Sequence, residues 1–546
     1  MDLSLVIVSV SLWLSLHAAI GGVAAVPTIQ LDRGVFIGNS TGTVDKFLGI
    51  PFALPPTGDR RFRLPEPNHP YEGAYNATVF GNSCPQQTAT PTIPNEIVGE
   101  ILSTYILVEG AHPQSEDCLS LNVWAPANTT ADANLPVLAW IYGGGWEVGE
   151  TATYNGEAVV QGSLNIGMPI IYVSMNYRLA AFGFLASREV KEAGVGNLGL
   201  HDQRQALRWI QTYIGTFGGD KDRVTIWGES AGSVSVALQM ITNGGNSEGL
   251  FHGAFMQSGS PLIVGDITHG QPYYDLIVNE VGCNGTEDTL QCLREAPYEK
   301  FQAASSSTPS LFSNTSLNLV WMPRTDGKFL TEDPQTLVKK GHVADIPFVN
   351  GDCDDEGTLF SLSSLNATSD EDTLKYIQSV YYPKTSSQEL DPVLQLYSSD
   401  PSEGSPFNTS SNNTLSPQYK RIAAIQGDIW FQGPRRLFFE YRSEKQNTWS
   451  YLYKGFKSTP FLGSFHSSDL IGIYGPGSDL GNFVIRFATG LDPNHGNTTI
   501  YWPRYTQKSR KLMTILDGSV PLTIGEDDFR EEGIKYLTQL MLQNPL

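Results

Sequence analysis

The chain has 546 residues, of which 40% are hydrophobic and 17% are charged, a composition typical of a globular protein with a large core. Its 54 glycines and 33 prolines indicate many loops. The formal net charge of −21 argues against nucleic acid or anionic membranes as partners, because an acidic surface repels both.

The N-terminus has the pattern of a secretory signal peptide. An apolar run is followed by small residues, with a cleavage site after Ala25. We therefore predict a signal peptide at 1–25, a single mature domain at 26–546 and an extracellular location. Asp2 stands in a region that is usually basic, so an uncleaved N-terminal anchor is the alternative. No later run reaches the length of a membrane span.

N-glycosylation sequons are dense along the chain, which independently indicates secretion and places their asparagines on surface loops. The nine predicted sites are Asn39, Asn76, Asn128, Asn284, Asn314, Asn366, Asn408, Asn412 and Asn497.

The pattern G-x-S-x-G first occurs as "GNSTG" at 38–42. It follows "RGVFI" and precedes "TVDKFLGI", two runs that read as strands. We predict a hairpin turn between them, with Ser40 as an ordinary turn residue.

Five cysteines in an oxidising compartment should mostly pair. Cys283 and Cys292 are nine residues apart and would close a small loop, after which Cys84 and Cys118 would close a longer one. Cys353 is left over, and we predict that it is a buried, unreactive thiol.

Short β-branched and aromatic runs predict strands at 136–142, 170–175, 224–227 and 346–349. A helical pattern at 205–217 separates two of them. This alternation predicts an α/β fold with a large, mostly parallel sheet flanked by helices. Chemistry in such a fold belongs at the C-terminal ends of the strands.

"YGGGWE" at 142–147 follows one of these strands. Consecutive glycines expose backbone N–H groups, which an oxyanion hole requires. Gly144 and Gly145 would supply two donors and Ala231 a third. A flexible glycine turn without function is the alternative.

Two other patterns do not support a cofactor or a metal. "GVGNLG" at 194–199 fits a dinucleotide loop, but the charged "SREVKEA" precedes it where a buried strand is needed. "DCDDEG" at 352–357 resembles the start of a calcium loop, yet Ser363 stands where the bidentate Glu should be. We predict neither a cofactor nor a metal.

The second match to G-x-S-x-G lies in "VTIWGESAGS" at 224–233. A short buried strand leads into it and "SVSVALQMIT" reads as a buried helix after it. Strand, tight turn and helix form the setting of a nucleophile elbow, so Ser230 is the predicted nucleophile.

The base should follow the serine and the acid along the chain. His342, His466 and His495 lie more than a hundred residues beyond the serine. His466 stands between apolar runs, whereas the other two lie in solvated turns, so His466 is preferred.

Four acidic residues follow the predicted strand at 346–349, and composition does not choose among them as the partner of the histidine. They are Asp352, Asp354, Asp355 and Glu356.

With these motifs in place, the chain resembles the cholinesterase-like type-B carboxylesterase/lipase family, and most of all its secreted fungal lipases and sterol esterases. The resemblance rests on "FLGIPFALPPTGDRRF", "SEDCLSLNVWAP", "YGGGWE", "MNYRLAAFGFL", "NLGLHDQRQALRWI", "FGGDKDRVTIWGESAGS", "FMQSGS", "DDEGTLF" and "FHSSDL".

The resemblance implies an α/β-hydrolase fold without a cofactor, Glu356 as the acid and His466 as the base. It also implies the two disulfides that spacing suggests. Where relatives usually have Phe after the glycines, this chain has Trp146, a bulkier ring that we expect to reshape the acyl pocket.

The segment at 85–117 carries an apolar stripe at helical spacing that includes Ile97, Ile101, Tyr105 and Val108. In the related lipases this segment is a flap over the site. We expect a mobile lid that touches lipid interfaces, with a fixed surface helix as the alternative.

The predicted function is that of a secreted serine hydrolase acting on hydrophobic esters, as a monomer or weak homodimer. A carboxylesterase for small or aromatic esters is one alternative. A non-catalytic binding or adhesion protein is disfavoured, because Ser230, Glu356 and His466 are all present.

Overall fold

The computed structural model describes residues 26–88, 112–474 and 477–545. The predicted signal peptide and most of the predicted lid therefore lie outside the described residues. Within those ranges, no helix combines the length and apolar character that a membrane crossing needs.

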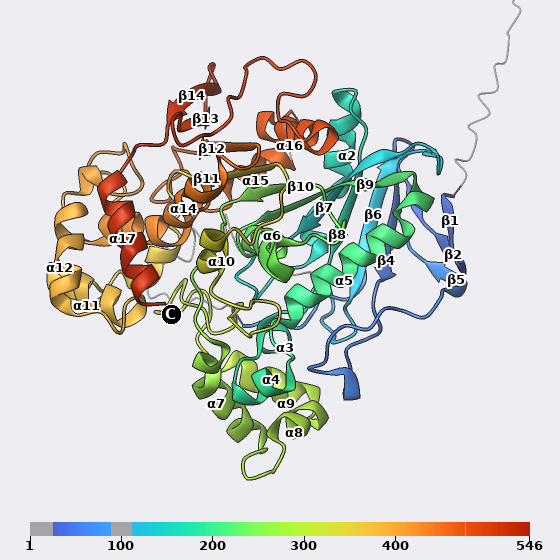
Figure 1. Ribbon diagram of the computed structural model, residues 1–546, viewed down its shortest axis with the longest axis horizontal. Helices are drawn as coiled ribbons and strands as arrows, with labels where there is room; N and C mark the ends of the chain where they lie inside the picture. The colour runs from blue at the N-terminus through green and yellow to red at the C-terminus, as the bar shows by residue number, and fades with distance from the viewer. Residues whose placement is uncertain (1–25, 89–111, 475–476, 546) are drawn as a thin grey trace, which may run out of the picture.

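A large mixed sheet forms the centre of the described chain, with the strand order β14-β13-β12-β11-β10-β9-β7-β8-β6-β4-β3 (Figure 1). Neighbouring strands from β8 to β13 are parallel, and the antiparallel strands lie at the two edges. The expected mostly parallel sheet is thus confirmed. Its strands are β3 (Asn39–Ser40), β4 (Val44–Pro51), β6 (Ser120–Pro126), β7 (Leu135–Ile141), β8 (Ile171–Met175), β9 (Gly219–Glu229), β10 (Gly253–Gln257), β11 (Phe348–Cys353), β12 (Thr448–Lys454), β13 (Lys511–Leu516) and β14 (Leu522–Glu526).

A second, three-stranded sheet contains β1 (Thr28–Leu31), β2 (Arg33–Ile37) and β5 (Glu72–Asn76). The predicted hairpin between "RGVFI" and the next strand is therefore wrong, because β2 pairs with β1 and β5 whereas β4 pairs with β3 and β6. The chain changes sheets at Gly38. A side chain there would lie 2.5 Å from the backbone oxygen of Lys46, so the two sheets approach closely.

Helices cover both faces of the large sheet (Figure 1). The helices α2 and α16 pack on one face, and α5 and α6 pack on the other. The described helices are α2 (Gly156–Asn165), α3 (Ala180–Phe184), α4 (Arg188–Ala193), α5 (Leu198–Tyr213), α6 (Ala231–Ile241), α7 (Gln271–Val281), α8 (Thr289–Glu295), α9 (Tyr298–Ser306), α10 (Pro334–Lys340), α11 (Asp370–Val380), α12 (Ser387–Leu396), α13 (Tyr419–Gly427), α14 (Gly433–Arg442), α15 (Ser468–Ile473), α16 (Asp479–Gly490) and α17 (Glu531–Gln543).

The strand β11 differs from its prediction in a way that matters for the site. It begins two residues later than the predicted strand and continues through Cys353, so Asp352 belongs to the strand. Asp352 is fully buried and accepts a hydrogen bond from the equally buried Arg435 at 2.8 Å. This ion pair allows a charged residue inside a strand, which an apolar pattern does not predict.

Both predicted disulfides are present, Cys84–Cys118 and Cys283–Cys292. Cys353 is a buried free cysteine, as expected. The first disulfide closes the base of the predicted lid segment.

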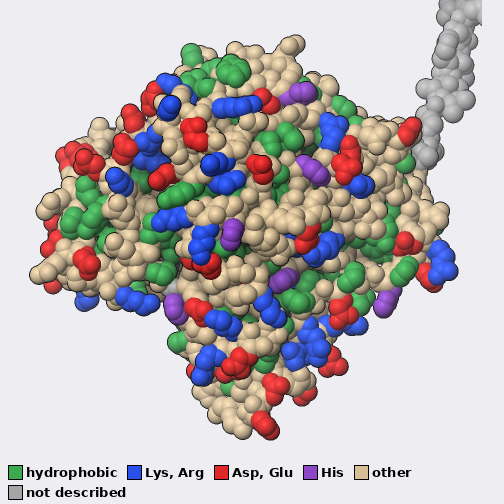
Figure 2. Space-filling view, in the orientation of Figure 1, with side chains coloured by type: hydrophobic (Ala, Val, Ile, Leu, Met, Phe, Trp, Pro, Cys, Tyr) green, Lys and Arg blue, Asp and Glu red, His purple; other side chains and the backbone are tan. Residues whose placement is uncertain are grey.

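All nine sequon asparagines are exposed. Asn39 and Asn76 nevertheless lie in strands, at the start of β3 and the end of β5, so the expectation of loops is wrong for these two. On the face shown in Figure 2, acidic and basic side chains are interspersed.

Candidate active site

Ser230 occupies a crowded corner between β9 and α6. Its φ of +55° and ψ of −127° are unusual for a residue with a side chain. The flanking glycines make the corner possible, because a Cβ on Gly228 or Gly232 would overlap a backbone carbonyl oxygen. The Ser230 N–H donates to the carbonyl of Gln257 at 2.9 Å, which ties the corner to β10.

His466 lies next to Ser230, on the turn between β12 and α15. Its Nε2 is 2.7 Å from the Ser230 Oγ, and its Nδ1 is 2.5 Å from Oε2 of Glu356. The rings of Phe360 and Phe431 flank the imidazole, with centroids 5.1 and 4.8 Å away. The histidine is 5% exposed, so it is held in place and largely shielded from water.

Glu356 follows β11 and is 1% exposed. Its Oε1 accepts a hydrogen bond from the N–H of Cys353 at 2.6 Å, which leaves the other oxygen directed at the histidine. The structure thus brings Ser230, His466 and Glu356 into one hydrogen-bonded chain.

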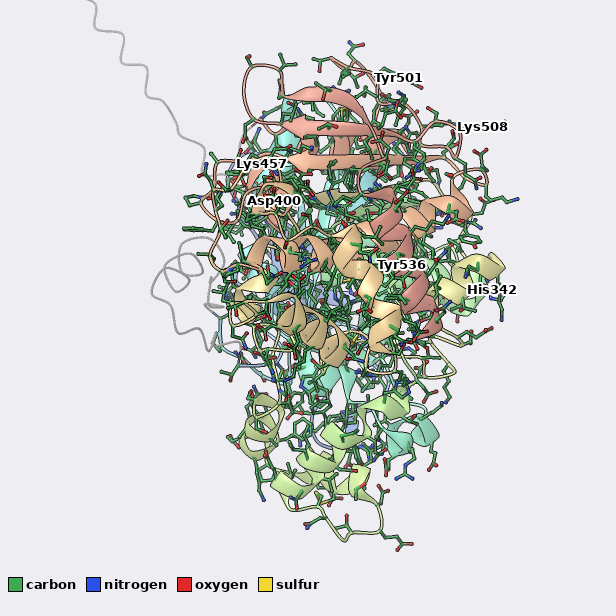
Figure 3. The ribbon with its side chains drawn as sticks, turned by 90° about the vertical axis from the view of Figure 1, so that its left-hand side faces the viewer. His342, Asp400, Lys457, Tyr501, Lys508 and Tyr536 are labelled. Carbon is green, nitrogen blue, oxygen red and sulfur yellow. A yellow bond between two sulfur atoms is a disulfide. The ribbon has the colours of Figure 1, made fainter. Side chains whose placement is uncertain are left out.

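The rival residues lie elsewhere. Asp354 and Asp355 both accept hydrogen bonds from Lys457, so they take part in a separate ion-pair cluster. His342 and His495 are exposed. Figure 3 labels His342, which stands at the outer edge of the molecule in that view, and also labels Lys457.

Burial favours the neutral forms of the central pair. It lowers the pKa of His466 and raises the pKa of Glu356 well above its usual range. A neutral imidazole at neutral pH is able to accept a proton from a serine hydroxyl.

Glu229, the residue before the serine, is a second carboxyl group at the site. Its Oε1 lies 3.4 Å from Nε2 of His466 and accepts a hydrogen bond from Ser467. Burial raises the pKa of Glu229 to about 7. Its negative charge in turn raises the pKa of His466, against the effect of burial.

The glycine segment runs alongside the serine. A Cβ built on Gly143 would lie 2.8 Å from the Cβ of Ser230, so no side chain fits between them. Gly144 and Gly145 have φ values of +101° and +64°. Among the described residues, neither their N–H groups nor that of Ala231 meets a backbone or side-chain acceptor. The three donors are thus free to bind an oxyanion beside Ser230.

A cavity of about 700 Å³ opens over these groups. Apolar side chains form much of its wall, and four of the polar ones lie in the described parts of the predicted lid segment, near its two ends. The apolar wall includes Trp146, Val234, Leu262, Leu311, Phe312, Leu317, Leu319, Leu359, Phe360, Trp430 and Phe431; the polar lining includes Gln86, Gln87, Thr88, Gln114, Glu150, Thr153 and Gln302.

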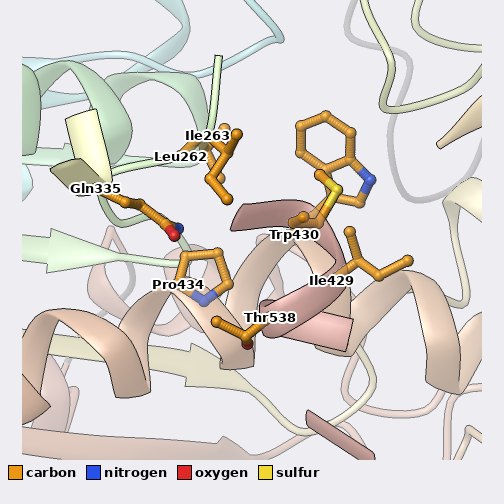
Figure 4. Close-up of a pocket in the computed structure, with 8 residues that line it drawn as sticks. Leu262, Ile263, Gln335, Ile429, Trp430, Pro434 and Thr538 are labelled. Atoms are coloured by element: carbon orange, nitrogen blue, oxygen red, sulfur yellow. The ribbon is translucent and has the colours of Figure 1, made fainter. Parts of the chain in front are cut away.

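A separate small cavity of about 10 Å³, whose lining is drawn in Figure 4, shares Leu262 and Trp430 with this wall. Such a volume holds one water molecule at most. It is therefore a packing gap and not a ligand site.

Sequence reasoning missed several residues around the histidine. Glu229 could have been found from its place directly before the predicted nucleophile, and Phe360 from its place four residues after Glu356. Phe431 lies in a π-helical turn, Asp428–Gln432, far from any motif, and no sequence signal indicated it.

Comparison with known proteins agrees with this geometry. Residues 25–529 match the carboxylesterase family. Lipase 4 of Diutina rugosa is 39% identical over 94% of this chain and 96% of its own length. The secreted triacylglycerol lipase LIP1 of Gibberella zeae is 39% identical, over 94% and 90% respectively.

Among solved structures, the crystal structure of Aspergillus niger EstA matches with a TM-score of 0.82 and 28% identity, covering 96% of this chain and 99% of that one. The shared architecture confirms the expected α/β-hydrolase fold. The chain belongs to the carboxylesterase family and is a carboxylic ester hydrolase.

Proposed function

We propose that this protein is a secreted serine esterase that hydrolyses hydrophobic carboxylic esters through Ser230, His466 and Glu356. One observation carries the proposal: the unbroken hydrogen-bonded chain from Ser230 Oγ through the His466 ring to Glu356, at the floor of a large cavity. Nucleophile, base and orienting acid in this order are the parts of a catalytic triad.

In the proposed reaction, Ser230 Oγ attacks the ester carbonyl carbon while His466 Nε2 takes the hydroxyl proton. The oxygen that becomes negative accepts hydrogen bonds from the N–H groups of Gly144, Gly145 and Ala231. The imidazolium then gives its proton to the departing alkoxide, and an acyl-enzyme remains.

Water completes the cycle. His466 takes a proton from the water as its oxygen attacks the acyl carbonyl, and returns that proton to Ser230 Oγ as the acid leaves. Glu356 keeps the imidazole oriented in both halves, and the positive charge that His466 gains when it takes a proton favours the ionised form of Glu356, which stabilises the imidazolium.

The apolar wall supports an extended or bulky acyl group as the preferred substrate, because burying such a chain in an apolar pocket is favourable. Similarity to fungal lipases supports the same choice. Membership of the carboxylesterase family keeps small or aromatic esters as the second candidate. Two disulfides, nine exposed sequons and relatives named as secreted lipases support secretion.

The test is the initial rate on p-nitrophenyl esters from acetate to palmitate, with Ser230→Ala as the blank. A maximum at long chains is the expected result. A maximum at acetate or butyrate would instead assign the protein to small-ester carboxylesterases. A fluorophosphonate label on Ser230, located by peptide mass, checks the nucleophile independently of substrate choice.

A further inference from the structure

A hydrogen-bonded chain joins the two separate parts of the proposed oxyanion hole. The indole Nε1–H of Trp146 donates to the hydroxyl of Ser235 on α6 at 3.0 Å. The same hydroxyl donates to the carbonyl of Ala231 at 2.8 Å. Trp146 directly follows the glycines, and Ala231 supplies the third N–H group.

The hydroxyl of Ser235 is fully used in this arrangement. It gives its single proton to Ala231 and accepts from Trp146 and from Nε2 of Gln203, at 3.1 Å. Ser235 and Gln203 are both 0% exposed, and Trp146 is 3% exposed. Water therefore does not compete for these bonds, and losing one partner would leave a buried polar group unpaired.

The backbone at Trp146 also needs support. Its φ of +56° lies in the left-handed region, which is unfavourable for a bulky side chain. It continues the positive φ values of Gly144 and Gly145. The N–H of Ala180 donates to the Trp146 carbonyl at 2.7 Å, so the residue is held at its backbone and at the end of its side chain.

We propose that Trp146 is a positioning residue that fixes the glycine segment to helix α6 through Ser235, and thereby sets the distance between the oxyanion donors. This inference rests on the proposed function, because it assigns a role within that site. A phenylalanine would fill part of the same space but could not donate the hydrogen bond. The tryptophan at this position thus makes a rigid connection that a purely apolar ring lacks.

The key variant is Trp146→Phe, and the chain offers a matched control in Trp430→Phe. Trp430 lines the same cavity and is similarly buried, but its indole nitrogen has no hydrogen-bond partner among the described residues. The control removes the same atoms and no hydrogen bond, so it gives the size of the effect of lost packing.

We expect Trp146→Phe to lower kcat on p-nitrophenyl butyrate about tenfold, with little change in KM, because a misplaced donor affects the transition state more than the bound ester. The decrease should exceed that of Trp430→Phe at least fivefold. Affinity for a trifluoromethyl ketone, whose serine adduct places an oxyanion in the hole, should weaken in proportion to kcat.

Ser235→Ala should lower kcat to a similar extent. The double variant should have about the same kcat as the less active of the two single variants, because both substitutions break the same series of hydrogen bonds. Melting temperatures of all variants identify any loss caused by unfolding. Independent, multiplying effects would overturn the inference, as would a kcat in Trp146→Phe no lower than in Trp430→Phe.

Fluorophosphonate labelling separates the two proposals. A labelled Ser230 together with an unchanged kcat in Trp146→Phe would overturn this inference alone. No label on Ser230 in the unaltered enzyme would overturn the proposed function and this inference with it.

Discussion

The chain contains the pattern G-x-S-x-G twice, and the two copies fold into different environments. At Gly38–Gly42 the two neighbours of the serine are exposed, and although Gly38 is crowded by Lys46, a Cβ on Gly42 would meet no atom within 4 Å. At Gly228–Gly232 the corresponding residues are buried or nearly so, and both glycines are crowded by backbone oxygens. The difference teaches that burial and crowding on both sides of the serine, and not the residue pattern alone, distinguish the corner at Ser230 from a surface turn.

The sharpest test of this comparison replaces each serine in turn. Ser230→Ala is expected to lower kcat on the best p-nitrophenyl ester by about 10⁴-fold or more, because the nucleophile is lost. Ser40→Ala should retain the rate, since its hydroxyl lies at a surface turn at the end of β3, where it accepts a hydrogen bond from Gly42 N–H. Substantial turnover by Ser230→Ala would show that another group is the nucleophile.

The glycines of the two corners should differ in stability. In Gly232→Ala the new methyl group would overlap the Ile141 carbonyl, so we expect a loss of about 3 kcal/mol or more. Gly42→Ala has free space but a φ of +89°, which predicts a loss of about 1 kcal/mol. Thermal unfolding of both variants measures this order. Equal melting temperatures would contradict the claim of a crowded corner.

Glu229, the residue before Ser230, offers a test by the pH dependence of activity. The proposed mechanism requires a neutral His466, and burial lowers its pKa, so the acid limb of kcat/KM should lie below pH 6.5. The charge of Glu229 raises that pKa. Because the pKa of Glu229 is itself raised to about 7, this carboxyl is only partly charged near the limb, so Glu229→Gln should move the limb to lower pH by a small amount. A shift to higher pH, measured across pH 4 to 8, would contradict this sign.

Asn39, the counterpart of Glu229 in the surface copy, should give the smallest effect. It is exposed and starts a sequon. Asn39→Gln is expected to leave kcat and KM within error and to reduce the mass of protein secreted from a eukaryotic host by one glycan. An unchanged mass would mean that this sequon is not used.

Local patterns predicted the strand, turn and helix around Ser230 well, because β-branched runs and clustered glycines act over a few residues. The prediction of a hairpin at Gly38 was wrong because the sheet that a strand joins depends on partner strands distant in sequence. Asp352 was placed outside β11 because its buried partner, Arg435, lies 83 residues away.

The choice of Glu356 among four acids illustrates the same limit. Composition left it open, and the family resemblance selected it. The structure explains the difference physically: Lys457 engages Asp354 and Asp355, Arg435 engages Asp352, and only Glu356 faces the histidine.

The sequence separation of Ser230 and His466 has a consequence for biosynthesis. Ser230 and His466 are 236 residues apart in sequence and meet only when β9, β10, β11 and β12 have assembled. A ribosome that has just made the corner at Ser230 has not yet made His466, its proposed base. On the proposed mechanism, the growing polypeptide therefore carries no assembled hydrolytic centre until His466 has been made and the four strands have come together.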